Sequence, residues 1–453
     1  MMNIDRGRKN RDKASVATVP DIVIDGGLLL PMAENQPPVS PARVEVKDGK
    51  IINITQSSEE DPYPDGAEII DAREGIIMPG LINSHTHTAM TIFRGLADDL
   101  PLKQWLFEKI FPAEAAHLNS ETVYWGTLLG CLEMIASGTT TMIDGYFFQD
   151  DTARAVHQSG LRALIAQGVI DFPAPGVSDP RENLRVGRHF IEKWLHFSEL
   201  ISPGLFCHSP LTCSEKTLRG AMEISEDYDL PLQTHLSETR GEVDEIRRKT
   251  GQKPLKYLDS LGLANENLIA AHAVHLDNEE MELLAAKGVR VVHVPESNMK
   301  LASGVARIPE MVKMGLPVGL GTDGCASNNN LDMFQEMDSA AKLHKVHGMD
   351  PVCMDAGTIM KMATSQGAKI CGLENEIGTI EKGKRADIIV LDLQSPHMIP
   401  LYNPISTLVY SANGGDVKDV IVNGRVLMKE RTFMTLDPEE IMARVREISR
   451  KIR

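Results

Sequence analysis

Eight short apolar runs in the middle of the chain are the feature that most limits its fold. Each run between residues 79 and 379 is followed by a longer stretch of helical character, and most runs end in His, Asp or Glu. Continuous apolar runs of this kind are expected for parallel strands covered on both faces. The alternation predicts a (β/α)8 barrel, in which the carboxyl ends of the strands carry the active site. The runs end in GLINSHTH, TTTMIDGYF, RALIAQGVID, SPGLFCHS, LPLQTHLSE, NLIAAHAVHL, VRVVHVPESN and LPVGLGTDG.

Short β-type segments flank this region on both sides. They include DIVIDGGLLLPM and ARVEVKDGKIINI before it, and RADIIVLDL and VKDVIVNGRVLM after it. Two separated sets of strands predict one small β-sandwich assembled from both ends of the chain. The predicted organisation is a loose tail at 1–20, a β-sandwich formed by 21–78 and 380–430, the barrel at 79–379, and a C-terminal helix at 431–453. Within the barrel, SETVYWGTLLGCLEMIASG predicts a helix with Ser120 as its cap.

Charge and composition exclude several classes of protein. The net charge is −16 and the pI is about 5.4, so a nucleic-acid partner is not expected. The first residues lack the apolar core of a signal peptide, and no apolar run is long enough to span a membrane. The six cysteines form no CxxC pair, which favours reduced thiols in a cytoplasmic protein.

Four strand ends carry residue types that bind metals. His85 and His87 close the run GIIMPGLINSHTH, and residues two apart on a strand point to the same side. His235 ends LPLQTH, and Asp323 ends LPVGLGTD. An isolated HxH pair would be equally consistent with two surface histidines. Four such ends in one barrel instead indicate a metal site, where open coordination allows an ion to activate water.

Two further residues are candidates for handling protons. Glu238 follows His235 by three residues, so its carboxylate is expected above the metal site, where it could take up and deliver a proton. The alternative is a glutamate favoured by the helix dipole. His272 comes directly off the run NLIAAH and is the better candidate to orient the attacking water. We expect structural roles for His275 and His293.

The motifs MPGLINSHTHTAM, THLSE, AAHAVHL and LGTDGCASNNN resemble the deaminase and chlorohydrolase branch of the amidohydrolase superfamily. FRGLADDLPLKQWLFEKIFPAEAA, LEMIASGTTTMIDGYF and HSPLTCS are similar to the 5'-methylthioadenosine/S-adenosylhomocysteine deaminases. The resemblance runs from about residue 21 to about residue 430 in order. It implies a barrel capped by a β-sandwich from both termini, and hydrolytic removal of the amino group of 5'-substituted adenosines.

The resemblance also implies a site with one divalent metal, usually zinc. Its ligands would be His85, His87, His235 and Asp323. Relatives with two metals carry a carbamylated lysine on the fourth strand, and no lysine stands at the end of that run here. By the same resemblance, Glu238 shuttles protons and contacts the purine, His272 polarises the attacking water, and Asp323 accepts the water proton.

Three positions match the nucleoside-binding part of the family. Trp105 would cover one face of the ligand, Glu114 would accept hydrogen bonds from both ribose hydroxyls, and His208 would contact the ribose or the purine edge. Spacing alone would favour an amphipathic-helix tryptophan and a solvated glutamate. The expected partner is a small nucleoside, and the expected assembly is a homo-oligomer.

Recognition of a charged 5' tail is left open by the sequence. Some family members use arginines after the third strand for this purpose, whereas Gln167 stands there in this chain and Arg181, Arg185 and Arg188 follow only later. Two alternatives also stay open. One is a hydrolase acting on guanine, another purine base or a chlorotriazine, and the other is a homologue that keeps the barrel without catalysis.

Overall fold

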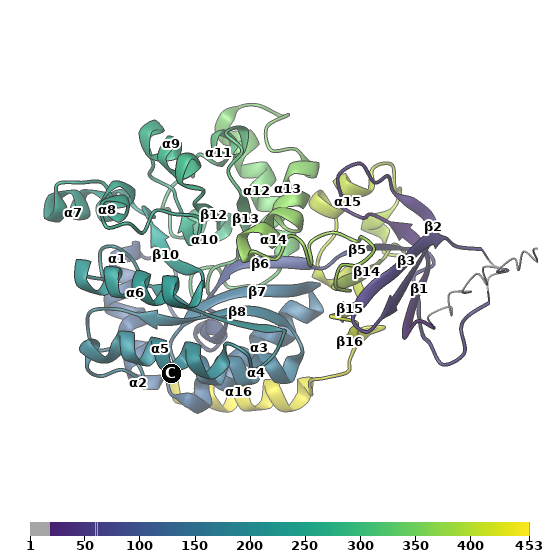
Figure 1. The fold of residues 1–453 in the computed structure, drawn as a ribbon, viewed down its shortest axis with the longest axis horizontal. Coiled ribbons are helices and arrows are strands. Elements are labelled where there is room, and N and C mark those ends of the chain that lie inside the picture. The colour runs from purple at the N-terminus through teal and green to yellow at the C-terminus, as the bar shows by residue number, and fades with distance from the viewer. Residues whose placement is uncertain (1–18, 59, 61, 453) are drawn as a thin grey trace, which may run out of the picture.

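The computed structural model describes residues 19–58, 60 and 62–452, and its larger sheet-and-helix unit is a barrel (Figure 1). Eight strands lie side by side in chain order, and each of the neighbouring pairs is parallel. The backbone N–H of Asp323 donates to the carbonyl oxygen of His85 at 3.0 Å, which joins the last strand end to the first. The predicted barrel is confirmed. Its strands are β6 (Leu81–Thr86), β7 (Thr139–Tyr146), β8 (Arg162–Val169), β9 (Ile201–Cys207), β10 (Leu232–Leu236), β11 (Leu268–His272), β12 (Arg290–His293) and β13 (Val318–Leu320).

Helices follow the strands and cover the outside of the barrel. The predicted helix at residue 120 begins there, but its cap is Asn119, whose side chain accepts hydrogen bonds from the N–H groups of Glu121 and Thr122. The expectation of a Ser120 cap was therefore wrong by one residue, because Asn caps as well as Ser does. The helices after the first two strands are η1 (Thr88–Phe93), α1 (Leu102–Gln104), the π-helix η2 (Trp105–Ile110), α2 (Phe111–His117), α3 (Ser120–Ala136) and α4 (Gln149–Ser159). Those after the remaining strands are η3 (Pro180–Glu182), α5 (Asn183–Trp194), α6 (Glu215–Tyr228), α7 (Arg240–Thr250), α8 (Pro254–Ser260), α9 (Asn278–Lys287), α10 (Pro295–Lys300), α11 (Ile308–Lys313), α12 (Met333–Gly348), α13 (Ala356–Met362) and α14 (Ser365–Cys371).

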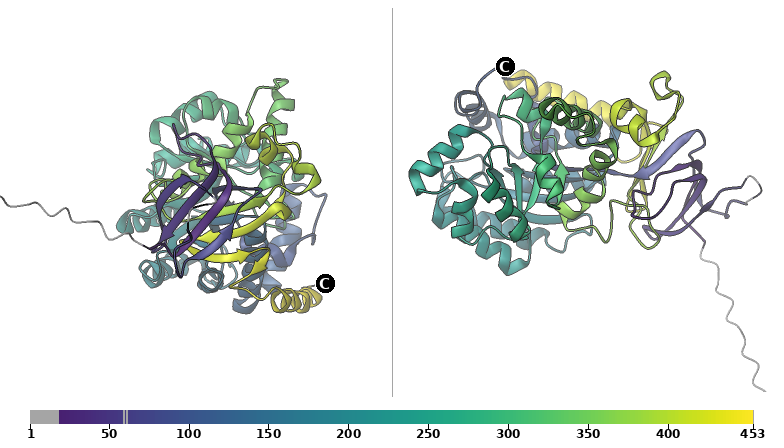
Figure 2. Two further views of the ribbon diagram at one scale, coloured as in Figure 1. Left: turned by 90° about the vertical axis from the view of Figure 1, so that its right-hand side faces the viewer. Right: turned by 90° about the horizontal axis from the view of Figure 1, so that it is seen from above.

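Both ends of the chain meet in a second, mixed sheet (Figure 2). Strand β5 (Gly75–Pro79) pairs antiparallel with β14 (Ile388–Asp392), although more than 300 residues separate them. This confirms a small β domain built from both termini. Its other strands are β1 (Ile22–Leu29), β2 (Val39–Lys47), β3 (Lys50–Gln56), β4 (Glu68–Asp71), β15 (Val417–Val422), β16 (Arg425–Lys429) and β17 (Thr432–Phe433), and the short helices η4 (Pro396–Met398), α15 (Pro404–Tyr410) and η5 (Gly414–Asp416) connect the later ones.

The second sheet lies at the end of the barrel where the strands begin (Figure 1). Arg162, the first residue of β8, forms an ion pair with Asp387, with Nε 2.8 Å from Oδ2 and both side chains buried. The N–H of Gly80 donates to the carbonyl oxygen of Asp387 at 3.0 Å. Because the sheet occupies this end, the loops at the carboxyl ends of the strands are left free to form a site.

The last helix, α16 (Pro438–Ile452), leaves the second sheet and returns along the barrel (Figures 1 and 2). It packs on α3 and on η1, and it buries Ile441, Val445 and Ile448. The domain boundaries that we derived from the sequence stay predictions, and the loose tail predicted at 1–20 falls mostly outside the described residues. Within the described part of the chain, no helix combines the length and the apolar character that a membrane crossing needs.

Candidate active site

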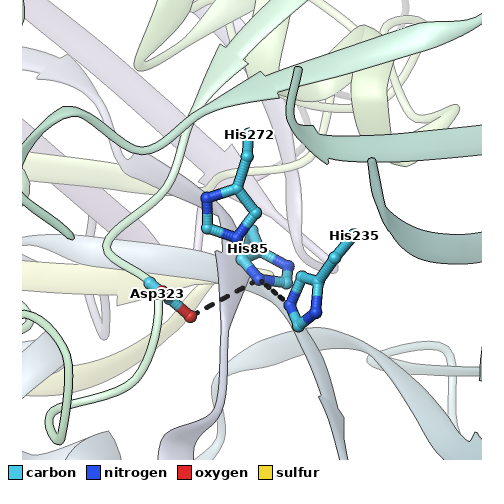
Figure 3. A group of neighbouring side chains, drawn as sticks. All are labelled: His85, His235, His272 and Asp323. Atoms are coloured by element: carbon cyan, nitrogen blue, oxygen red, sulfur yellow. Dashed lines mark hydrogen bonds and ion pairs between the residues drawn. The ribbon is translucent and has the colours of Figure 1, made fainter. Parts of the chain in front are cut away.

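Four side chains meet at the carboxyl ends of the barrel strands (Figure 3). His85 comes from β6, His235 from β10, His272 from the last position of β11, and Asp323 follows β13. One nitrogen or oxygen of each lies within 4.8 Å of the corresponding atoms of the others. Nε2 of His85 is 3.2 Å from Nε2 of His235 and 3.6 Å from Oδ1 of Asp323. Strands far apart in sequence thus deliver three imidazoles and one carboxylate to one point.

The charge states in this cluster suit a cation. Burial lowers the pKa of His85 to about 4 and the pKa of His235 well below its usual value, so both rings are neutral near pH 7. Burial acts to raise the pKa of Asp323, but hydrogen bonds to His85 and His87 hold that pKa well below its usual range. Two lone pairs on nitrogens 3.2 Å apart repel each other unless a proton or a cation lies between them. Neutral imidazoles with a carboxylate are a typical donor set for zinc and similar ions.

His87 lies beside this group and is oriented by the backbone. Its Nδ1 is 2.5 Å from the carbonyl oxygen of Gly145, and its Nε2 is 3.2 Å from Oδ1 of Asp323. A backbone carbonyl on one ring nitrogen is the usual arrangement for a metal-binding histidine. The group that mutual distance defines contains His272 rather than His87. The structure thus brings four predicted histidines together around Asp323, and it does not divide the five side chains into metal ligands and catalytic groups.

The backbone at two of these positions is strained. His272 has a φ of 72° and Asp323 a φ of 61°, both in the left-handed region that non-glycine residues seldom occupy. Each costs on the order of 1 to 3 kcal/mol and persists only where the surrounding structure enforces it. Such strain concentrates at functional sites, and here it turns the side chains at the ends of β11 and β13 toward the cluster.

Glu238 lies next to His272, where the sequence predicted a proton carrier. Its Oε2 is 3.9 Å from Nε2 of His272, and its Oε1 accepts a hydrogen bond from the Ser303 hydroxyl at 3.2 Å. Its backbone N–H donates to Oε2 of Glu242 at 2.8 Å. Desolvation raises the pKa of Glu238, which favours the protonated form that a proton carrier needs.

A cavity opens directly onto the cluster and contains the three predicted nucleoside-binding residues. It is lined by Trp105, Glu114, His208 and Glu238, together with members of the cluster. Trp105 is buried, and its indole N–H donates to the carbonyl oxygen of Ala97 at 3.0 Å. A second cavity, of about 840 Å³, adjoins the first and shares His208, His235 and Glu238 with it.

Glu114 is the least expected of these residues. Its side chain is almost fully buried, and Oε1 accepts a hydrogen bond from the Tyr146 hydroxyl at 2.5 Å. Burial raises the pKa of Glu114 to about 7, although the bond from Tyr146 opposes this shift. His208 is also held, with Nδ1 3.0 Å from the hydroxyl oxygen of Thr212, and burial lowers the pKa of His208 to about 3. Sequence spacing had favoured a solvated glutamate at position 114, and it did not single out Tyr146.

The residues considered for a charged 5' tail do not reach the cavities. Gln167 is buried, but its amide group makes long hydrogen bonds to the backbone of Gly168 and Gln149. Three arginines lie on η3 and α5 and form ion pairs there with Asp179, Glu182 and Asp227; they are Arg181, Arg185 and Arg188. None of these four side chains lines either cavity, among the residues that the structure describes.

The two histidines expected to be structural have partners away from the cavities. His275 Nε2 lies 2.7 Å from the carbonyl oxygen of Ser303, and His293 Nε2 lies 3.0 Å from Nε2 of His344. Sequence reasoning overlooked three hydroxyl and amide residues that contact the cluster. Ser297 and Ser327 donate to Oδ2 of Asp323 at 2.7 and 2.8 Å, and Asn298 hydrogen bonds to His272. Their only signal was the run of small polar residues after two of the strands, VPESN and DGCASN.

The fold and the site together define an enzyme of the (β/α)8-barrel hydrolase class, with a His and Asp cluster at the carboxyl ends of its strands. The chain belongs to the amidohydrolase family, whose model matches residues 76–427.

Similar proteins extend over almost the whole chain. A 5-methylthioadenosine/S-adenosylhomocysteine deaminase of Syntrophus aciditrophicus is 45% identical over 96% of this chain and 98% of its own. A 5'-deoxyadenosine deaminase of Methanopyrus kandleri is 43% identical over 90% of this chain and 94% of its own. The crystal structure of an adenosine deaminase from Xanthomonas campestris with bound zinc superposes with a TM-score of 0.93, at 36% identity, over 96% of this chain and 98% of that one.

Proposed function

We propose that this protein is a metal-dependent aminohydrolase that converts 5'-substituted adenosines, such as methylthioadenosine or S-adenosylhomocysteine, into the inosine-type product and ammonia. The observation that carries the proposal is the shared cavity. One cavity is lined by His235, His272 and Asp323 of the cluster, by Glu238 and by the buried Glu114, so it combines water activation, proton transfer and a carboxylate suited to a ribose diol. The names of the similar proteins from Syntrophus and Methanopyrus support the same substrate class.

The proposed cofactor is one divalent ion, most simply zinc, held by His85, His87, His235 and Asp323. The neutral imidazoles of His85 and His235 and the ionised carboxylate of Asp323 fit such an ion. Strand β9 ends at Cys207 and His208 follows it, so no lysine stands there to bridge a second ion. When bound, the ion would supply a Lewis acid that lowers the pKa of water at the site.

The protein side chains then manage the protons. Asp323, together with His272, accepts one proton of water as the water oxygen adds to C6 of the adenine ring, while Glu238, whose pKa is raised by desolvation, protonates ring nitrogen N1. The proton held at Asp323 and His272 then passes to the amino group, and Glu238 takes up the proton of the C6 hydroxyl as the C6–N bond breaks, which releases ammonia and restores both carboxyl groups. Oε2 of Glu238 lies 3.9 Å from Nε2 of His272, so the two groups can act on neighbouring atoms of one bound ring.

The remaining residues position the nucleoside. Glu114 keeps one oxygen on Tyr146 and has the other available for the ribose hydroxyls, which are good donors to a carboxylate. Trp105 covers one face of the ligand, and the neutral ring of His208 contacts the ribose or the purine edge. A small nucleoside is thus the proposed partner, and homo-oligomeric assembly and a cytoplasmic location stay predictions.

An ammonia-release screen tests the proposal. It compares methylthioadenosine, S-adenosylhomocysteine, adenosine and 5'-deoxyadenosine with guanine and a chlorotriazine. We expect the highest kcat/KM with a 5'-substituted adenosine. Faster turnover of guanine, or chloride release from the triazine without turnover of any nucleoside, would instead favour the alternative of a hydrolase acting on a purine base or a chlorotriazine. Absence of turnover with every compound, in protein shown to contain metal, would contradict an enzymatic role.

A further inference from the structure

The segment after β12 supplies no residue to the proposed reaction, yet it contacts every group that handles a proton. Ser297 in α10 donates to Oδ2 of Asp323 at 2.7 Å, and Ser303 beyond that helix donates to Oε1 of Glu238 at 3.2 Å. Between them, Oδ1 of Asn298 lies 2.9 Å from Nδ1 of His272. The contact to His272 determines more than position, because the partner of one imidazole nitrogen decides which nitrogen carries the proton.

Asn298 is buried and is held in place by backbone hydrogen bonds. It is 1% exposed, its backbone N–H donates to the carbonyl oxygen of Val294 at 3.1 Å, and its carbonyl oxygen accepts from the N–H of Ser303 at 2.9 Å. Its side-chain oxygen faces the ring of His272. The amide Nδ2 is buried and has no hydrogen-bond partner among the described residues. Among the described residues, the side-chain amide of Asn298 therefore makes its polar contact through Oδ1, which acts as an acceptor.

The contact at Nδ1 of His272 also affects Nε2, the other nitrogen of the ring. A carbonyl-type oxygen can only accept, so a hydrogen bond to Oδ1 of Asn298 requires the proton on Nδ1 of His272, and in the neutral ring Nε2 then presents a lone pair. Nε2 is the nitrogen that faces Glu238, at 3.9 Å from Oε2, and His272 belongs to the cluster in Figure 3. The strained backbone of His272, with φ at 72°, further fixes the direction in which the ring points.

We propose that Asn298 is a positioning residue that holds the imidazole of His272 in the tautomer with its proton on Nδ1, so that Nε2 faces the reaction as a proton acceptor. The kinetic part of this inference rests on the proposed deaminase function. Asn298 lines neither cavity, so it acts through His272 and does not touch the substrate.

Two substitutions separate this role from simple packing. Asn298→Asp keeps an oxygen acceptor toward Nδ1, and a second carboxylate oxygen replaces the Nδ2 group, which has no partner among the described residues. Asn298→Leu has a similar size and removes the acceptor. We expect the leucine variant to lower kcat by about 10- to 100-fold, the usual effect of losing such an orienting partner, with KM unchanged. The aspartate variant should recover most of that loss. Asn183→Leu, which removes another buried amide, should lower stability but leave kcat close to that of the wild type.

A spectroscopic measurement tests the tautomer without any turnover. In the full-length chain with ¹⁵N-labelled histidine, the resonances of His272 are assigned by comparison with His272→Gln. We expect Nδ1 to be the protonated nitrogen in the wild type, and the preference to be lost in Asn298→Leu. A proton on Nε2 in the wild type would overturn the proposal, as would an aspartate variant no better than leucine or a leucine variant with normal kcat. If no nucleoside is turned over, the proposed function fails, but the ¹⁵N measurement still shows whether Asn298 determines the tautomer of His272.

Discussion

The hydroxyl group of Tyr146 lies 2.5 Å from Oε1 of Glu114, and both side chains are buried in the wall of the cavity that contains the His and Asp cluster. Tyr146 ends β7, and Glu114 belongs to α2, so the bond fixes a carboxylate from a loop-derived helix against the rigid barrel. One oxygen of Glu114 is thereby oriented, and the other remains for a ligand. In the proposed function, this pair is the part of the site that distinguishes a nucleoside from a free base.

Substitution of Glu114 tests that distinction. Two hydroxyl bonds to a buried carboxylate should contribute roughly 2 to 4 kcal/mol, so Glu114→Ala should lower kcat/KM for a 5'-substituted adenosine by about 30- to 1000-fold. A 2',3'-dideoxy analogue has no diol and should lose little. Steady-state kinetics on both substrates, with metal content measured in parallel, checks this. Equal losses on the two substrates would show that Glu114 serves the fold instead.

The raised pKa of Glu114 should make the stability of the protein depend on pH. Its pKa is about 7 in the folded chain and 4.5 when unperturbed, so between these values the folded state retains a proton that the unfolded chain has released. The contribution of Glu114 to stability therefore falls as pH rises through this window. Relative to Glu114→Gln, the free energy of unfolding of the wild type should decrease by up to about 3 kcal/mol between about pH 4.5 and about pH 8. Urea titrations of both metal-free proteins measure this difference. If the free energy of unfolding of the wild type, relative to that of Glu114→Gln, stays constant or increases with pH, the raised pKa of Glu114 is contradicted.

Glu238→Gln should separate proton transfer from metal binding. The amide keeps the size of the side chain and the contact to Ser303 but carries no exchangeable acid proton, so turnover should fall at least ~100-fold. Metal content should stay intact, because Glu238 lies beyond the proposed ligands. Glu266→Gln, on an exposed residue, serves as the control with unchanged turnover. Loss of the ion in Glu238→Gln, or near-normal turnover, would count against the role of proton carrier.

Metal removal tests the composition of the cluster. A chelator should abolish activity, and one equivalent of a divalent ion per chain should restore it, since three histidines and one aspartate without a bridging lysine suit a single ion. Metal analysis of the active protein gives the stoichiometry. Saturation of activity only at two ions per chain would exclude the single-ion site, and full activity after complete removal would exclude metal dependence.

The ion pair between Arg162 and Asp387 should hold the barrel against the second sheet. Both side chains are buried, and Asp387 also accepts a hydrogen bond from the backbone of Asn423 at 2.7 Å. Arg162→Met leaves a buried carboxylate without its partner, which should cost about 3 to 5 kcal/mol of stability. The double variant Arg162→Met with Asp387→Leu should recover much of the lost stability, because it no longer buries an unpaired carboxylate. Denaturant unfolding of the wild type, the two single variants and the double variant gives the double-mutant cycle. Equal stability of Arg162→Met and the wild type would show that the ion pair contributes nothing to stability.

The sequence by itself determined the barrel and the centre of the site. Eight apolar runs with intervening helices specify parallel strands, and parallel strands in a barrel end at the same rim. His85, His235 and Asp323 are recognisable because they stand at those ends, so local pattern and topology together predict that they meet. The β segments at both ends of the chain likewise predicted a second small domain, although the pairing of β5 with β14 was not readable from either strand alone.

Only the tertiary structure decided which polar residues are buried in the cavity and which contacts orient the cluster. Trp105 and Glu114 lie in a segment whose spacing suits an amphipathic helix with a solvated glutamate, and their burial depends on where the turns after β6 place that segment over the barrel. Tyr146, Ser297 and Asn298 became recognisable only through distances to residues far away in the chain. Hydrogen bonds of this kind depend on positions accurate to fractions of an ångström, whereas hydrophobic periodicity records only which face of an element is buried. A linear pattern therefore predicts which strand ends converge, and the packed fold determines their protonation states and partners.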